Sequence, residues 1–167
     1  MIKEVLLFLV GGPLIVECVG YLWHRFVEHK GIFGKILLYR HWVHHKVEYT
    51  TDKLRREEYH NANSWSWFVL AGLTIGLVFI LFTIKEAIIL SLSGLLYGWF
   101  VMGKFHTIFH LKNHWLKKFD WMNRLIKLHD IHHYDNVNYG ITFFFMDRLF
   151  GTYRNDYPNR EHNIFSK

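Results

Sequence analysis

Three long apolar runs dominate the sequence and limit what this chain can fold into. They cover residues 5–23, 65–84 and 87–105. As a helix, each run would span roughly 28–30 Å, which matches the hydrocarbon core of a bilayer. Hydrophobic residues make up 51% of the chain and charged residues only 20%, so a disordered chain is excluded. We therefore predict an all-α membrane protein with about three transmembrane helices.

The remaining segments fit a single membrane domain that covers residues 1–167, a length that suits one domain and not two. Residues 111–128 alternate apolar and basic side chains at helical spacing, which is typical of a helix on the membrane surface or of an ordinary packing helix. Residues 155–167 are polar and should form a peripheral tail. The first apolar run has no small-residue cleavage motif, so we interpret it as a retained helix rather than a signal peptide.

The basic residues indicate how the helices are oriented. Three crossings would place every histidine on one side of the membrane, together with 18 of the 20 lysine and arginine residues. Only Lys3 and Lys85 would lie on the other side. The positive-inside rule then predicts a cytoplasmic histidine side, at the plasma (inner) membrane of a prokaryote or the endoplasmic reticulum of a eukaryote. The net charge of +6 is thus an excess beside the membrane, and we expect no nucleic-acid partner.

Ten of the 13 histidines lie in four short groups whose spacing suits metal binding. The groups are His24 and His29; His41, His44 and His45; His106 and His110; and His129, His132 and His133. Residues three and four apart share one face of a helix, so each group of three should point its imidazoles in one direction. His24 and His29 are five apart, so a helix end or bend must bring them together.

Neutral imidazole is a preferred ligand of iron, zinc and copper. Ten converging rings exceed what one ion can use, so the sequence predicts two metal ions. A single histidine is more often an ordinary polar residue, and we expect no ligation by His60, His114 or His162.

The four groups, in this order on a hydrophobic frame, resemble those of the fatty acid hydroxylase/sterol desaturase superfamily of integral membrane oxygenases. The most specific part is HDIHHYDNVNYGITFFFMDRLFGTY, residues 129–153, which is similar to the end of fatty acid 2-hydroxylases. The resemblance covers roughly residues 15–154 and implies transmembrane helices with a cytoplasmic helical cap. It also implies that the ten grouped histidines hold two metal ions, iron in the active enzyme and sometimes zinc in the purified protein.

The resemblance implies an O2-dependent monooxygenase that hydroxylates a C–H bond of a membrane lipid, with a fatty acyl chain as the favoured substrate. Such chemistry needs a redox metal and two external electrons per turnover. The sequence has no nucleotide-binding glycine motif, so a separate donor, an acidic ferredoxin or a cytochrome-b-type protein, should dock on the basic cytoplasmic face. Carotenoid hydroxylation and sterol oxidation or desaturation are alternatives within the superfamily. A non-catalytic membrane metal-binding protein is the alternative from another class.

Several residues near the histidines have two interpretations. Asp130, Asp135 and Asn138 flank the last group and either accept the outer N–H of a ligand histidine or face solvent. The aromatic stretch at residues 139–150 either lines the route of a lipid chain or anchors the cap. Glu17 lies two helical turns from His24 on the same face, as a functional acid or as a contact with a neighbouring helix.

Overall fold

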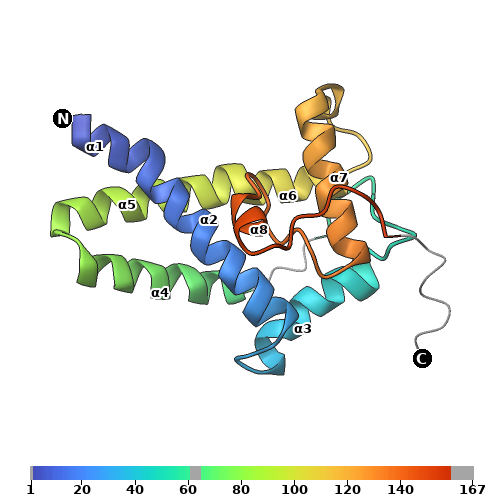
Figure 1. Cartoon of the computed structure of the whole chain (residues 1–167), viewed down its shortest axis with the longest axis horizontal. Coiled ribbons are helices and arrows are strands. Elements are labelled where there is room, and N and C mark those ends of the chain that lie inside the picture. The colour runs from blue at the N-terminus through green and yellow to red at the C-terminus, as the bar shows by residue number, and fades with distance from the viewer. Residues whose placement is uncertain (1, 61–64, 159–167) are drawn as a thin grey trace.

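The computed structural model describes residues 2–60 and 65–158. Every regular element in these residues is a helix, and the β-type pairing among them is limited to an isolated bridge between Arg56 and Leu111. The predicted all-α fold is therefore confirmed. The long helical stretches Ile2–His29, Ser66–Leu81 and Ile84–His110 form three rods. The rods run along the molecule, and most of the shorter helices lie toward the end opposite the N-terminus (Figure 1).

Two of the rods are long and apolar enough to cross a membrane: Ile2–His29 with 28 residues and Ile84–His110 with 27. Their α-helical parts are α1 (Ile2–Leu6), α2 (Gly12–Leu22), α5 (Ile84–Tyr97) and α6 (Gly103–His110). The π-helical turns within them are Leu7–Gly11, Trp23–His29 and Gly98–Met102. Because these turns join the α-helical parts without a break, both rods extend beyond the apolar runs of the sequence and carry histidines at their ends.

The third rod, α4 (Ser66–Leu81), is apolar but has only 16 residues, fewer than the predicted run. It ends early because Thr83 caps α5: the Thr83 hydroxyl accepts the backbone N–H of Glu86, and the Glu86 carboxylate accepts that of Thr83. Lys85 and Glu86, which lie between the second and third apolar runs of the sequence, are part of the first turn of α5.

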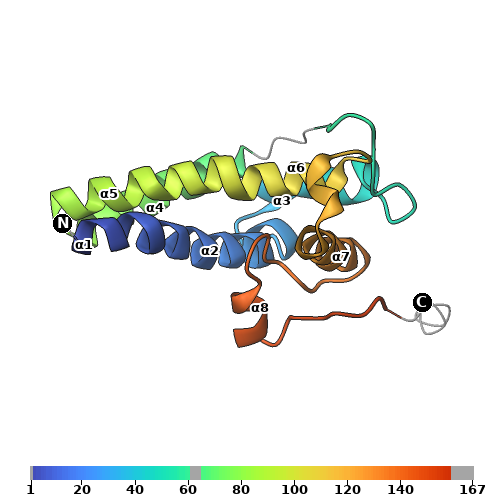
Figure 2. The same cartoon turned by 90° about the horizontal axis from the view of Figure 1, so that it is seen from above.

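The N-terminus is held against the turn between α4 and α5 by two ion pairs. The Lys3 ammonium lies 2.5 Å from the Glu86 carboxylate, and the Lys85 ammonium lies 2.7 Å from that of Glu4. Both views show α1 beside this turn, at the end of the molecule opposite most of the shorter helices (Figures 1 and 2). The described residues at this end carry few other charges.

Small residues let α2 and α5 pack closely. A Cβ atom built on Gly12 would lie 2.5 Å from the Ser93 hydroxyl oxygen and 2.7 Å from the Gly94 backbone nitrogen, so no larger residue fits there. The Ser93 hydroxyl in turn donates to the backbone carbonyl of Phe8. Such contacts between small residues are the usual means of joining helices in a bilayer, where lipid competes with apolar packing.

The remaining helices form a cap over the ends of the rods. They are α3 (Lys35–Val43), a π-helical turn (His44–Glu48), a 3₁₀ turn (Trp115–Lys118), α7 (Asp120–Tyr134) and α8 (Phe145–Leu149). The cap is joined to α6 by a small apolar core in which Phe109 and Met122 are completely buried. Figure 2 shows α7 across the end of the rods and α8 beside α2.

The prediction of one helix over residues 111–128 is wrong. Leu111 is extended and pairs with Arg56, and the His114 imidazole accepts the Leu116 backbone N–H to begin the 3₁₀ turn. A new helix, α7, starts only at Asp120 and continues to the last group of histidines. It buries its apolar face against the rods, so it is a packing helix of the cap. In the polar tail, residues 155–158 form no regular element and the rest lie outside the described residues.

Candidate metal centre

A π-helical turn brings His24 and His29 together. The turn Trp23–His29 forms hydrogen bonds between residues five apart, so those residues lie almost above one another. The ring centroids of the two histidines are 5.0 Å apart. The structure thus supplies the local departure from α-helical geometry that the spacing required.

The ten grouped histidines converge into two adjoining clusters. Cluster A consists of His24, His29, His41, His45 and His132, whose candidate ligand atoms all lie within 4.8 Å of one another. Cluster B consists of His44, His106, His110 and His129, which meet the same limit, and of His133, whose Nε2 lies 3.2 Å from that of His129. His44, His45 and His133 also form a group of this kind, so the two clusters share a border.

The two groups of three histidines are divided between the clusters. His44 belongs to cluster B although its neighbour His45 belongs to cluster A, and His132 and His133 are divided in the same way. Adjacent residues on a helix point about 100° apart, so two neighbouring imidazoles diverge. The prediction that each group points in one direction is therefore wrong. The division lets two segments each serve both clusters: α7, and α3 together with the π-helical turn that follows it.

Backbone carbonyls fix the outer nitrogen of several rings. The Nδ1 atoms of four histidines lie 2.6–3.0 Å from the carbonyl oxygens of residues 139, 54, 137 and 49. These histidines are, in the same order, His24, His110, His132 and His133. Because a carbonyl only accepts, Nδ1 must carry the hydrogen, and the Nε2 of each neutral ring presents a lone pair.

The Nε2 atoms face one another at distances that fit a shared cation. Six contacts between them measure 2.8–3.2 Å. His29 and His132 are an example at 3.1 Å, although the outer nitrogen of each already lies against an oxygen acceptor. Two lone pairs at this separation repel unless a cation lies between them. Two nitrogens bound at right angles to one ion, each at about 2.1 Å, would lie about 3.0 Å apart.

Burial keeps the cap histidines neutral and ready to bind metal. It lowers the pKa of His41, His44 and His45 well below its ordinary value, and neighbouring imidazoles lower it further. The same holds for the three histidines of α7. The Nε2 of His44 is buried without a hydrogen-bond partner among the described residues. A metal ion would satisfy that nitrogen, so the donor set fits two metal ions.

A family model described as fatty acid hydroxylase matches residues 9–152. The chain belongs to the fatty acid hydroxylase family. No curated protein and no solved structure matches it. The matched residues include all ten clustered histidines, so membership indicates a histidine-dependent lipid oxygenase, an oxidoreductase that uses bound metal. Together with the two long apolar rods, it indicates a membrane protein.

The three flanking residues Asp130, Asp135 and Asn138 do not contact the rings in this member of the fatty acid hydroxylase family. Asp130 binds the Arg55 guanidinium at 2.5 Å, and Asp135 binds that of Arg154. The Asn138 amide donates to the Leu128 carbonyl at 3.1 Å. The prediction that they accept from ligand histidines is therefore wrong. They hold the cap together instead, and main-chain carbonyls take the expected role.

Sequence reasoning missed Glu28, the nearest carboxylate to cluster A. Its side chain is almost fully buried, and one oxygen accepts the Ser66 hydroxyl at 2.5 Å. The other oxygen lies 3.8 Å from Nδ1 of His41. The available signal was an acid directly before His29, on a turn that must face the metal site. The histidines expected to be ordinary lie outside both clusters where described, at His60 and His114, and His162 lies outside the described residues.

An apolar cavity of about 580 Å³ leads from the rods to the clusters. One end is lined by His24, His41, His44 and His106, and the other reaches Gly12, Val78 and Leu90. From the aromatic stretch 139–150 only Ile141 lines it, so the prediction that this stretch walls the route of a lipid chain is wrong for this cavity. Glu17 is a contact between helices, since its carboxylate accepts the Tyr97 hydroxyl at 2.6 Å.

Proposed function

We propose that the chain is an O2-dependent di-iron hydroxylase that acts on a fatty acyl chain of a membrane lipid. The observation that carries this proposal is an apolar cavity between transmembrane rods whose inner end is formed by histidines of both clusters. An acyl chain is the apolar molecule that a bilayer supplies in quantity, and it can reach this cavity without leaving the membrane.

The five histidines of cluster A would hold one ion and the five of cluster B the other. Two bound iron ions would supply what no side chain can, the activation of O2 by reduction so that hydrogen is removed from an unactivated carbon. The overall reaction uses one O2, two electrons and two protons, and it yields one hydroxyl group and one water. Zinc fits the same nitrogen donors but supplies no redox chemistry, so it would give an inactive protein.

The protein's own residues position the rings and the substrate. Main-chain carbonyls orient the imidazoles, which removes the need for the rings to reorganise when a metal binds. Apolar side chains of α2, α4 and α5 line the cavity, exclude water and align the hydrocarbon chain with the clusters. Which carbon of the acyl chain reacts therefore depends on how far the acyl chain extends past His106.

The histidine end of the molecule should face the cytoplasm. Nearly all basic residues in the described part of the chain lie in the cap or near it, whereas the opposite end carries Lys3 and Lys85, both paired with carboxylates. A cytoplasmic cap is also where soluble electron carriers are available to a membrane oxygenase.

Lipid analysis tests the proposed function directly. Expression in cells that lack the gene should add products one oxygen heavier than the host's fatty acyl chains. The His44→Ala variant should insert into the membrane but yield none of these products. A gain of oxygen on carotenoids or sterols, with acyl chains unchanged, would overturn the acyl assignment, and no oxygenated lipid at all from an iron-loaded protein would overturn the oxygenase.

Narrowing the cavity should shorten the chain that the enzyme accepts. Gly98 lines the cavity, and a Cβ atom built on it meets only Val16, at 3.8 Å, so a Gly98→Leu side chain would extend into open space. Gly98 lies about 12 Å along the helix from His106, which leaves room for a short chain only. The products measured by mass spectrometry should therefore shift to shorter acyl chains.

The matched control is Gly76→Leu on α4. Gly76 does not line the cavity, and a Cβ atom there meets nothing within 4 Å. This variant should keep the wild-type product profile. An unchanged profile in Gly98→Leu would show that the substrate chain does not occupy this cavity.

A further inference from the structure

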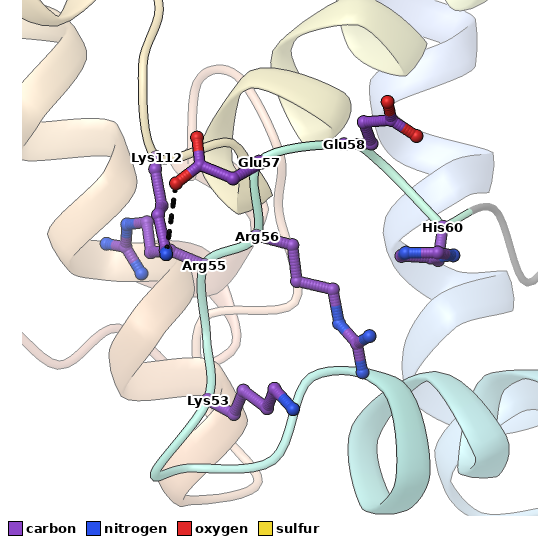
Figure 3. A pocket seen from close by; sticks show the side chains of 7 residues that line it. All are labelled: Lys53, Arg55, Arg56, Glu57, Glu58, His60 and Lys112. Carbon is purple, nitrogen blue, oxygen red and sulfur yellow. Dashed lines mark ion pairs between the residues drawn. The ribbon is translucent and has the colours of Figure 1, made fainter.

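A basic pocket lies on the surface of the cap. Figure 3 shows the side chains that line it, which come from the loop after the π-helical turn His44–Glu48 and from the residues that follow α6. They are Lys53, Arg55, Arg56, Glu57, Glu58, His60 and Lys112. Four basic groups thus face two carboxylates, and one ion pair, between Lys112 and Glu57 at 3.1 Å, joins the two sides of the pocket.

Hydrogen bonds connect the main chain of the pocket loop directly to His110 of cluster B. The Arg56 backbone N–H donates to the His110 carbonyl at 2.9 Å, and the Lys112 N–H donates to the Arg56 carbonyl at 2.8 Å. The Leu54 carbonyl accepts the imidazole N–H of His110 at 3.0 Å. A single layer of backbone therefore separates the pocket from a ring of the metal centre.

Stacked aromatic rings provide a second connection between the pocket and cluster B. The Tyr49 ring, fully buried, stacks on the His110 ring with 3.9 Å between centroids. The Arg56 guanidinium lies 5.6 Å from the centroid of the same tyrosine ring. The Tyr59 ring stacks on the Tyr49 ring with 5.9 Å between centroids. The Tyr59 hydroxyl lies 3.2 Å from Nδ1 of His106.

We infer that this pocket is the docking site of an acidic one-electron carrier, which passes electrons through Leu54 and Tyr49 to His110 and cluster B. The inference rests on the proposed function, because the proposed hydroxylase needs two external electrons per turnover and a non-catalytic metal-binding protein needs none. Each docking would oxidise one carrier by one electron and reduce one metal ion by one electron, and two dockings would serve each turnover. No bond is made or broken in the protein.

Charge explains why an acidic carrier would choose this surface. Opposite charges on two proteins steer their encounter and raise the association rate, an effect that salt weakens. Lys53 and Lys112 are exposed, so they can reach a partner. Arg55 and Arg56 hold Asp130 and the Glu48 carbonyl, so they shape the pocket as well as adding charge.

The docking test uses the full-length protein in detergent and a plant-type ferredoxin as the acidic carrier. Binding is measured by surface plasmon resonance on metal-free protein, so it does not depend on the metal or on hydroxylation. The double variant Lys53→Glu/Lys112→Glu should weaken binding by about tenfold or more and reduce its dependence on salt. A control with the same charge change outside the pocket, Lys35→Glu/Lys118→Glu, should bind as the wild type does. Equal binding by the two variants would overturn the docking site.

The path is tested by the anaerobic oxidation of reduced ferredoxin by iron-loaded protein, followed by absorbance. Tyr49→Leu removes the stacked ring and Tyr49→Phe keeps it, and both retain the main-chain contacts. The leucine variant should bind ferredoxin normally but oxidise it more slowly than the phenylalanine variant. Reduction by dithionite should be the same in both, which shows an intact metal centre. Equal ferredoxin rates would overturn the tyrosine path, and failure of the proposed function would appear separately, as normal electron uptake without a lipid product.

Discussion

Replacing His132 with alanine should leave about one metal ion per chain and no detectable hydroxylation. The Nε2 of His132 lies 3.1 Å from that of His29 and 3.2 Å from that of His45, near the centre of cluster A. The substitution removes from cluster A a ligand nitrogen that lies against those of His29 and His45. Cluster B keeps all five of its histidines. His44→Ala should remove the other ion instead. Elemental analysis of the purified protein measures both effects.

His114→Ala is the control for these variants. His114 lies outside both clusters, so its replacement should keep two ions per chain and full turnover. Circular dichroism should show the same helix content in all three variants. Two tightly held ions in His132→Ala would contradict the assignment of this residue as a ligand.

Asp147→Asn should have the second largest effect, although Asp147 touches no histidine. Its buried carboxylate accepts the backbone N–H groups of Tyr139 and Gly140, each at 2.8 Å, and the Thr152 hydroxyl at 2.7 Å. An asparagine amide would turn a donor toward one of these donors. Losing a charged hydrogen bond and leaving a buried donor unpaired should cost about 3 kcal/mol of folding free energy.

The same substitution should weaken metal binding at cluster A more than at cluster B. Asp147 fixes the loop whose carbonyls, at residues 137 and 139, orient His132 and His24. Loss of such outer contacts lowers metal affinity by about 10–100-fold. Chelator competition measures the affinity, and thermal unfolding measures the stability. Asp135→Asn, which breaks an exposed ion pair with Arg154, should change both very little, and an equal loss of metal from the two clusters would contradict this role for Asp147.

Sequence periodicity predicted the parts of this molecule that depend on local spacing. The apolar runs became helical rods, and the four histidine groups came together because residues three to five apart on a helix lie on neighbouring faces. The division of the groups between two clusters was also within reach, since adjacent residues such as His44 and His45 diverge on any helix.

Other features depend on contacts that no local pattern encodes. The outer partners of the rings are mainly main-chain carbonyls, which every residue carries, so no side chain marked residues 49, 54, 137 or 139. Leu111 is extended because it pairs with Arg56, more than fifty residues earlier, and this pairing ended the helix that the amphipathic pattern predicted. The apolar cavity likewise forms only when three rods pack together.

The π-helical turn Trp23–His29 has a consequence for how the spacing within a histidine group can vary among related chains. Such a turn differs from a regular one by a single extra residue, and it returns to α-helical geometry when that residue is lost. Two histidines with four residues between them on a π-helical turn would therefore present their imidazoles much as two histidines with three residues between them do on an α-helical turn. The spacing between two ligand histidines can thus differ by one residue without changing the site. A search that requires one fixed spacing would overlook relatives that build the same site.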